Sequence, residues 1–247
     1  MKAMLVGGSA VPRAMIAAFE SRHGLRIVQG WGMTETSPVA STAALPPDLA
    51  EADDDTRWDY QAMVGFPLPF VEIRVRAGDE DVPWDGEAMG ELEVRGPWVA
   101  ASYHDAPETA DRWTDDGWFR TGDIVSIHPR GFIQIKDRSK DVIKSGGEWI
   151  SSVELENALM AHPAVAEAAV IAVPDDKWGE RPLAAVVLRE GGSASADELR
   201  EFLAPSFARW WVPERIEFVA EIPKTSVGKF RKIALREQFA AETAPAS

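Results

Sequence analysis

The spacing of apolar residues near the N-terminus predicts a strand, a helix and a second strand. Residues 3–6 are mostly apolar, Pro12 suits the first turn of a helix that ends near His23, and Gly24 is a natural stop. A second apolar run at residues 25–28 completes an order that is typical of a βαβ unit in a parallel sheet. A sheet of these strands alone would leave a bare hydrophobic face, so we expect the chain to be the C-terminal portion of a longer protein.

From residue 64 to residue 136 the pattern changes to short runs of apolar and polar residues separated by glycine and proline. This pattern predicts a small antiparallel β subdomain. Its expected strands are residues 71–76, 91–95, 124–128 and 132–136. The segment at residues 45–59 is acidic and turn-rich, and it is expected to be exposed or mobile.

The remainder of the chain mixes strands and helices. The expected strands are residues 165–173, 183–188 and 215–219, and the expected helices are residues 153–161, 196–203 and 231–241. Two S-x-x-E capping boxes mark helix starts, one at Ser151 and Glu154 and one at Ser195 and Glu198. These elements predict a small α+β domain.

A charged tetrapeptide, Asp137 to Lys140, separates the two patterns. Such a segment cannot be buried without partners, so we expect it to face water, a ligand or another domain. The predicted fold class is therefore α/β plus α+β. Residues 1–137 would form the C-terminal part of a large N-terminal domain, residues 138–247 a mobile C-terminal domain, and residues 137–141 the hinge.

Composition narrows the partners and the compartment. Forty acidic against 26 basic residues give a net charge of −14, which repels phosphate backbones and disfavours a nucleic acid as partner. The absence of cysteine excludes disulfides and thiolate sites, and it is consistent with a cytoplasmic location. No window approaches the run of about 20 apolar residues that a transmembrane helix needs.

Two short motifs could bind a ligand. The loop from Gly30 to Glu35 follows a strand end, where Thr34 could bind a phosphate oxygen and Glu35 could hold Mg²⁺; alternatively it is a glycine turn with a solvated carboxylate. Asp123, after Thr121 and Gly122, could accept hydrogen bonds from a ribose at a strand edge, or could belong to an ordinary turn.

The segment from Pro223 to Arg231, PKTSVGKFR, is basic in an otherwise acidic chain. It lacks the upstream glycine of a Walker A loop, so it is no P-loop. Lys229 beside a glycine could reach an anionic centre when a mobile domain closes. The alternative is a basic helix start, which the helix dipole disfavours.

Together these motifs resemble the adenylate-forming superfamily of acyl-CoA synthetases, luciferases and peptide-synthetase adenylation domains. The resemblance is carried, in order, by GWGMTET (residues 30–36), WFRTGD (118–123), GFIQIKDRSKDVIKSGGEWISSVELE (131–156) and PKTSVGKFR (223–231). It spans nearly the whole chain. The tract KSGGEWISSVELE is most similar to medium- and long-chain fatty acyl-CoA synthetases.

The resemblance implies ATP, CoA and a medium- or long-chain fatty acid as substrates. The carboxylate attacks the α-phosphate of ATP to give acyl-adenylate, and the CoA thiol then displaces AMP. Trp31, where the family usually has tyrosine, would stack on adenine, with Gly30, Gly7 and Gly8 beside it. A homodimer is also compatible with the resemblance.

The resemblance also implies roles for the polar residues. Thr34 would contact the α-phosphate and Glu35 the Mg²⁺, while Asp123 and Arg138 would hold the ribose hydroxyls. Lys229 matches the family's catalytic lysine, whose charge offsets the repulsion between two reacting anions.

The second half-reaction would use the C-terminal domain in another orientation. Lys140 lies at the position of the family's hinge, Gly146 and Gly147 would line a pantetheine channel, Trp149 would gate CoA or the nucleotide, and Lys144 would serve the thioester step.

The family's glycine-rich phosphate loop is absent from this sequence, as is most of the acyl pocket. We therefore expect little or no ligase activity from this chain alone. Two alternatives stay open: a truncated nucleotide-binding or partner-binding module, and an adenylating enzyme that delivers to another acceptor.

Overall fold

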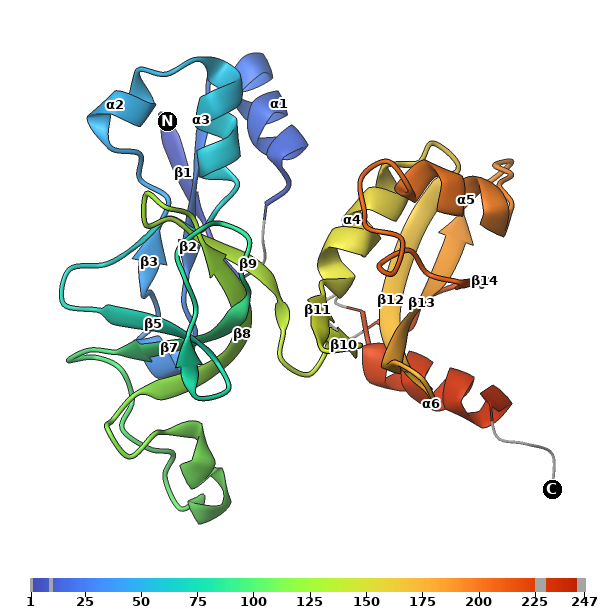
Figure 1. Cartoon of the computed structure of the whole chain (residues 1–247). Helices are drawn as coiled ribbons and strands as arrows, with labels where there is room; N and C mark the ends of the chain where they lie inside the picture. The colour runs from blue at the N-terminus through green and yellow to red at the C-terminus, as the bar shows by residue number, and fades with distance from the viewer. Residues whose placement is uncertain (1, 9–10, 225–229, 244–247) are drawn as a thin grey trace. The chain divides into compact units, whose positions relative to one another are not determined.

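The computed structural model of the chain describes residues 2–8, 11–224 and 230–243. The chain divides into two units, Met1–Lys136 and Asp137–Ser247, whose helices and strands are drawn in Figure 1. Each unit has its own hydrophobic core. The division falls one residue before the expected boundary. Both units combine helices with sheets, which confirms the predicted α/β plus α+β fold class.

The first unit opens with a sheet of the order β1–β2–β3–β4. Its strands are β1 (Ala3–Val6), β2 (Arg26–Trp31), β3 (Ser41–Thr42) and β4 (Phe66–Pro67). β1 and β2 are parallel and α1 (Arg13–His23) connects them, which confirms the βαβ unit. Ile16 of α1 packs with Ile27 of β2 in a buried cluster. β2 extends past residue 28 because Gly30 and Trp31 pair with β3.

The acidic segment at residues 45–59, expected to be turn-rich and exposed or mobile, is exposed or half-buried except at Leu49, but it forms two short helices instead of turns. They are α2 (Pro47–Ala50) and α3 (Asp54–Gln61). The Asp53 carboxylate accepts the Thr56 N–H at 2.9 Å and caps α3, and acidic residues in the first turn favour the helix dipole. Trp58 then packs against the cluster under α1.

The second sheet of this unit is antiparallel, with the order β6–β5–β7–β8–β9, which confirms the predicted β subdomain. Its strands are β5 (Glu72–Ala77), β6 (Glu80–Asp81), β7 (Gly90–Arg95), β8 (Phe119–Ile127) and β9 (Ile133–Arg138), and the 3-10 helices η1 (Thr34–Thr36) and η2 (Pro107–Arg112) lie in the loops of the unit. Leu92, Phe119 and Ile133 are fully buried in its core.

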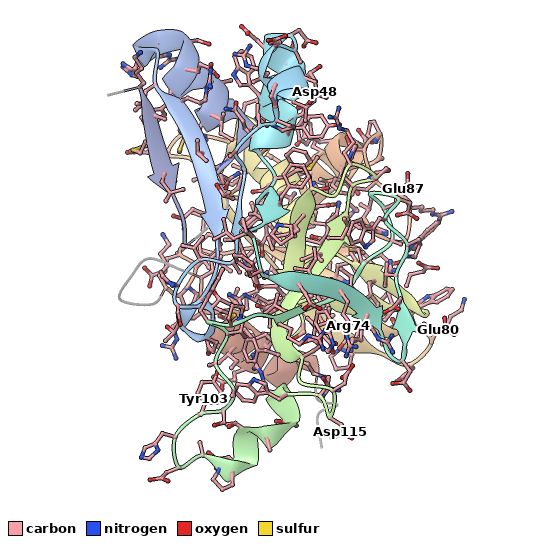
Figure 2. All side chains as sticks on the ribbon, turned by 90° about the vertical axis from the view of Figure 1, so that its left-hand side faces the viewer. Asp48, Arg74, Glu80, Glu87, Tyr103 and Asp115 are labelled. Atoms are coloured by element: carbon pink, nitrogen blue, oxygen red, sulfur yellow. The ribbon has the colours of Figure 1, made fainter. Side chains whose placement is uncertain are left out.

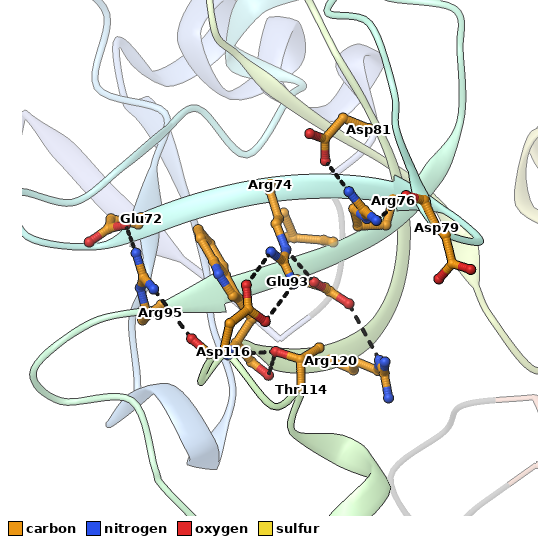
Figure 3. A network of polar contacts seen from close by, with 12 residues as sticks. Glu72, Arg74, Arg76, Asp79, Asp81, Glu93, Arg95, Thr114, Asp116 and Arg120 are labelled. Atoms are coloured by element: carbon orange, nitrogen blue, oxygen red, sulfur yellow. Dashed lines mark hydrogen bonds and ion pairs between the residues drawn. The ribbon is translucent and has the colours of Figure 1, made fainter.

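Alternating charges cross the surface of this sheet (Figure 3). Arg74 pairs with Glu93 at 2.6 Å and with Asp116 at 2.8 Å, as the dashed lines show. The Trp118 ring lies between the guanidinium groups of Arg74 and Arg95, which are 4.6 and 4.5 Å from its centroid. The hydrogen bond from Arg74, and after it the hydrogen bond from Thr114, lower the pKa of Asp116 to about 2. These pairs fasten the segment before β8 to the sheet.

The second unit has a five-stranded sheet with helices on both faces. Its path is β11–β10–β13–β12, and β14 pairs with β13 in parallel. The elements are β10 (Ile143–Ser145), β11 (Glu148–Ile150), α4 (Ser152–Ala161), β12 (Val165–Asp175), β13 (Gly179–Leu188), α5 (Ala196–Leu203), β14 (Arg215–Phe218) and α6 (Lys232–Thr243).

Successive side chains of β12 point to opposite faces of this sheet, as they do in any β-strand. Val170 packs in the cluster that contains the buried residues of α4 and α5, whereas Ile171 packs in the cluster that contains Leu235 and Phe239 of α6. The hydroxyl oxygens of Ser151 and Ser195 each accept the predicted capping hydrogen bond, at 3.1 and 3.2 Å.

Candidate functional site

Thr121, Gly122 and Asp123 lie inside β8, so the alternative of an ordinary turn before the strand is wrong. β8 lies between β7 and β9, and its pairing register with β7 shifts at this point. Gly122 has φ of 74°, and its N–H donates to the Glu91 carboxylate at 3.0 Å. The three residues therefore form a β-bulge, a feature that redirects the side chains beside it.

The bulge brings Asp123 to Trp31, which is 92 residues earlier in the chain. The indole Nε1–H of Trp31 donates to Oδ2 of Asp123 at 2.8 Å. Asp123 is only 2% exposed, and Trp31 packs against the core of the antiparallel sheet. The predicted adenine-stacking ring and the predicted ribose-binding carboxylate thus lie side by side.

The glycines assigned to the same site are also close to one another. A Cβ added to Gly7 would lie 3.0 Å from the carbonyl oxygen of Gly30. Gly30 lies within β2 and pairs with Thr42, not in a loop as predicted. Gly8 has φ of 91° and follows the end of β1. The ends of β1 and β2 therefore present backbone next to Trp31.

Thr34 and Glu35 lie in η1, which two residues separate from the end of β2. Thr34 is exposed, and the Glu35 carboxylate accepts a hydrogen bond from the Tyr103 hydroxyl. Figure 2 labels Tyr103, which lies on the long segment between β7 and β8. The hydrogen bond to Glu35 raises the pKa of Tyr103, and burial raises it further by a smaller amount.

Sequence reasoning missed Tyr103, because nothing in the sequence connects it with a residue 68 positions earlier. Within the described residues, no group of three or more histidine, aspartate or glutamate side chains could hold a metal ion. Glu35 offers a hard carboxylate oxygen, which fits Mg²⁺ that takes its other ligands from phosphates and water.

In the second unit, Asp137 is buried, contrary to the expectation that it faces water, a ligand or another domain. Its Oδ2 accepts hydrogen bonds from the Ser152 N–H at 2.7 Å and the Ser152 hydroxyl at 2.6 Å. Asp137 is 2% exposed at the N-terminus of α4, where backbone N–H groups favour a carboxylate. The Ser152 N–H and hydroxyl, which allow Asp137 to be buried, belong to the same unit as Asp137.

The rest of the predicted hinge forms a turn. The carbonyl of Arg138 accepts the N–H groups of Asp141 and Val142, each at 2.8 Å. The Arg236 guanidinium of α6 donates to the carbonyl of Lys140 at 3.0 Å and to the Asp141 carboxylate at 2.8 Å. Arg138 and Lys140 themselves are exposed.

Lys144, Gly146, Gly147 and Trp149 belong to the hairpin of β10 and β11. Lys144 faces Trp149 in the register, and its ammonium lies 5.8 Å from the ring centroid. Gly146 and Gly147 form the two-residue turn with φ of 60° and 90°, a conformation that favours glycine at both positions. The hairpin brings together four residues predicted for the CoA step.

A hollow of about 450 Å³ lies beside this hairpin. Lys140, Lys144 and Arg236 contribute positive charge to its lining, and Glu180 contributes a carboxylate. The Glu180 carboxylate accepts the Lys144 N–H at 2.7 Å and fastens β10 to β13.

Lys229 lies outside the described residues, so its predicted position is not tested. On either side, the Arg231 N–H donates to the Pro223 carbonyl at 2.8 Å, and Lys224 pairs with Glu167. No helix in the described part of the chain is long and apolar enough to cross a membrane.

Two family models match the chain. The model of the AMP-binding enzyme matches residues 1–104, and the model of the AMP-binding enzyme C-terminal domain matches residues 154–229. The chain therefore belongs to the AMP-binding, adenylate-forming enzymes that its motifs resemble.

Its relatives include several acyl-CoA ligases. It is 50% identical over 244 residues to a long-chain-fatty-acid–CoA ligase of Thermus thermophilus, across 97% of this chain and 44% of the relative. It is 44% identical over 243 residues to a 3-methylmercaptopropionyl-CoA ligase of Ruegeria pomeroyi (95% and 43%) and 40% identical over 239 residues to a medium-chain-fatty-acid–CoA ligase of Ectopseudomonas oleovorans (96% and 43%). The chain thus spans less than half the length of these relatives.

Solved structures give the same picture. ATP-bound MatB from Rhodopseudomonas palustris superposes with a TM-score of 0.80 at 29% identity, over 95% of this chain and 45% of that one. The o-succinylbenzoate CoA synthetase MenE from Bacillus subtilis, in complex with its acyl-adenylate, gives 0.80 at 30% (97% and 46%). The amide bond synthetase McbA from Marinactinospora thermotolerans gives 0.80 at 33% (96% and 47%).

Proposed function

We propose that this chain is the C-terminal part of an ATP-dependent fatty acyl-CoA ligase. The enzyme would join a medium- or long-chain fatty acid to AMP, release pyrophosphate, and then transfer the acyl group to CoA. The identity to the long-chain and medium-chain ligases supports this substrate class. On the acidic, cysteine-free composition we further propose a cytoplasmic location.

The observation that carries the proposal is the contact between Trp31 and Asp123. These residues were assigned to adenine and ribose from separate motifs, and their side chains are 2.8 Å apart. Gly7 lies against Gly30 at the same end of the sheet. A flat ring, a carboxylate and exposed strand-end backbone form a suitable surface for a nucleoside.

The reacting phosphates would lie toward η1 in this proposal. Thr34 would donate its hydroxyl to the α-phosphate, and Glu35 would hold Mg²⁺, which when bound supplies positive charge to the phosphate oxygens. Arg138 would assist Asp123 at the ribose. Lys229 would stabilise the negative charge that builds up as the carboxylate attacks, the interaction that often contributes most in such sites.

The thioester step would use the hairpin of the second unit. The hinge at Lys140 would let this unit rotate, so that Gly146 and Gly147 line the path of the pantetheine arm. Trp149 would close that path beside Lys144, which faces it across the hairpin.

The test is a chimera that places the part of the Thermus thermophilus relative not matched by this chain before residue 1. We expect it to release pyrophosphate and form acyl-CoA with a fatty acid, whereas the chain alone forms little or none. Replacing Lys229 by alanine in the chimera should lower adenylate formation by about 10² to 10³-fold, as loss of an electrostatic stabiliser does.

The products distinguish the alternatives. A chimera that adenylates fatty acids but forms an amide and no thioester would assign the acceptor chemistry named for McbA. A chain that binds ATP while the folded chimera forms no adenylate would favour a nucleotide-binding module and overturn the ligase proposal.

A further inference from the structure

Asp123 is buried, and both its carboxylate and its backbone N–H make hydrogen bonds within the first unit. Asp123 is 2% exposed, its Oδ2 accepts the Trp31 Nε1–H at 2.8 Å, and its own backbone N–H donates to the Thr121 hydroxyl at 3.1 Å. A buried carboxylate is costly unless it accepts hydrogen bonds. The indole of Trp31 is one of the groups that stabilise it.

The side chain of Trp31 has a single hydrogen-bond donor, the indole Nε1–H, and this donor is bonded to Asp123. A tryptophan that only stacked on a base could rotate about its side-chain torsions, whereas this ring is fixed in its plane by the bond to Oδ2. The ring also packs against the buried core of the antiparallel sheet. Its orientation is therefore set before any ligand arrives.

The other end of the contact is equally fixed. The Thr121 hydroxyl donates to the Leu92 carbonyl at 2.7 Å, and the Gly122 N–H donates to the Glu91 carboxylate at 3.0 Å. These bonds fasten the bulge of β8 to β7. Trp31 of β2 and Asp123 of β8 thus form a rigid connection between two sheets of the first unit.

We infer that Trp31 is a positioning residue for Asp123 as well as a stacking surface: its indole N–H orients the carboxylate that receives the ribose hydroxyls of a bound adenine nucleotide. The inference rests on the proposed nucleotide site. Phenylalanine at position 31 would keep a stacking ring but could not donate a hydrogen bond, so stacking and positioning can be separated.

The test is calorimetric titration of the intact chain with ATP, 2′-deoxy-ATP and 3′-deoxy-ATP. We expect Trp31→Phe to weaken ATP binding about tenfold, the effect of losing a hydrogen bond to a charged group. Trp31→Phe should weaken the binding of the deoxy analogues less, because each of them lacks one ribose hydroxyl that would donate a hydrogen bond to Asp123. The ratio of the affinity for ATP to the affinity for each deoxy analogue should therefore be smaller in Trp31→Phe than in the wild type.

The chain offers a matched control. The Trp58 Nε1–H donates to the Glu20 carboxylate at 3.0 Å in the same unit, remote from the bulge in sequence. Trp58→Phe removes the same type of bond and should leave the ribose preference unchanged. Thermal unfolding of both variants verifies that each is folded.

A second measurement applies even if Trp31→Phe does not fold. In the wild-type chain, hydrogen exchange of the Trp31 indole proton, observed by NMR, should be slow, and slower still with ATP. Exchange as fast as that of a free indole would overturn the inference.

The two proposals fail differently. If neither the wild-type chain nor the chimera with the relative's N-terminal part binds any of the three nucleotides, the proposed nucleotide site is wrong and the inference falls with it. If the wild type binds ATP and Trp31→Phe keeps the wild-type ratio of ATP to deoxy-ATP affinities, only the inference is overturned.

Discussion

At the residue scale, Tyr103 competes for the carboxylate that we propose holds Mg²⁺. Its hydroxyl donates to Glu35, and the backbone of Glu35 is separately fixed by the Ala100 N–H at 2.8 Å. The side chain of Glu35 is therefore the part that changes when Tyr103 is replaced. A hydrogen bond occupies a lone pair that a cation would use.

We predict that Tyr103→Phe lowers the Mg²⁺ concentration needed for half-maximal ATP binding by about fivefold, the effect of removing a competing hydrogen bond of about 1 kcal/mol. Calorimetric titrations of ATP at several Mg²⁺ concentrations measure it. Tyr60→Phe, which changes the other tyrosine of the chain, is the control. A rise in the required Mg²⁺ would mean that Tyr103 orients Glu35 for the ion instead.

The two turn glycines of the second unit give another comparison between single residues. Both have positive φ, but a Cβ on Gly146 would lie 2.8 Å from Cε3 of Trp178, whereas a Cβ on Gly147 would meet nothing within 4 Å. Backbone strain affects both positions, and a steric clash affects only one.

We therefore expect Gly147→Ala to lower the unfolding free energy by about 1–2 kcal/mol, the cost of a left-handed backbone at alanine. Gly146→Ala should cost more, because Trp178 must also move. Urea unfolding measures both. Equal losses would show that the ring of Trp178, which is 45% exposed, yields without cost.

At the scale of elements, a buried ion pair joins α6 to α4. The Lys232 ammonium lies 2.6 Å from the Glu156 carboxylate and donates to the Ser152 hydroxyl at 2.6 Å. Burial raises the pKa of Glu156 above its usual range. Because its folded-state pKa is raised, protonation of Glu156 favours the folded state at acid pH, and this contribution is lost as the pH rises through that pKa.

We predict that Lys232→Met lowers the unfolding free energy at pH 7 by about 3–5 kcal/mol, since it leaves a buried charge without its partner. The loss should shrink toward pH 4, where Glu156 can become neutral. Adding Glu156→Leu should restore only part of the stability: it removes the unpaired charge, but it leaves the buried Val170 N–H, which donates to Glu156 at 2.8 Å, without its acceptor. Urea unfolding at pH 7 and pH 4 measures the loss of unfolding free energy in each variant. A loss in Lys232→Met that is equal at both pH values would contradict the electrostatic explanation.

The elements that could be predicted are those whose signals are local. The S-x-x-E boxes located α4 and α5, and the apolar runs located β1, α1 and the long strands of the second unit. The helices within residues 45–59 were not predicted because the charges there were interpreted only as a sign of exposure, whereas Asp53 caps a helix that Trp58 anchors. Turn residues at Thr121 to Asp123 likewise concealed a bulge, which depends on the partner strand β7.

At the scale of the whole molecule, the order of the motifs was sufficient to predict the family, but not the contacts between them. The contact between Trp31 and Asp123, and that between Tyr103 and Glu35, join segments 92 and 68 residues apart. Such contacts depend on how sheets pack, and periodicity describes only one element at a time. Asp137 shows the same limit, since its burial depends on where α4 begins.

The second unit carries its whole core within itself, which predicts that it folds alone. Its two buried clusters draw only on residues between Ile143 and Phe239. The cut has to keep Asp137, because its carboxylate accepts both the N–H and the hydroxyl of Ser152 at the start of α4.

We predict that residues 137–247, expressed alone, unfold in one cooperative urea transition. Asp137→Ala in this piece should lower its unfolding free energy by about 1–3 kcal/mol, since it leaves two buried donors of Ser152 without an acceptor. Asp176→Ala, which removes another acidic residue from the same unit, serves as the control and should have little effect. A piece without a cooperative transition would mean that the second unit needs the first, and an unchanged Asp137→Ala variant would mean that water replaces the carboxylate at the start of α4.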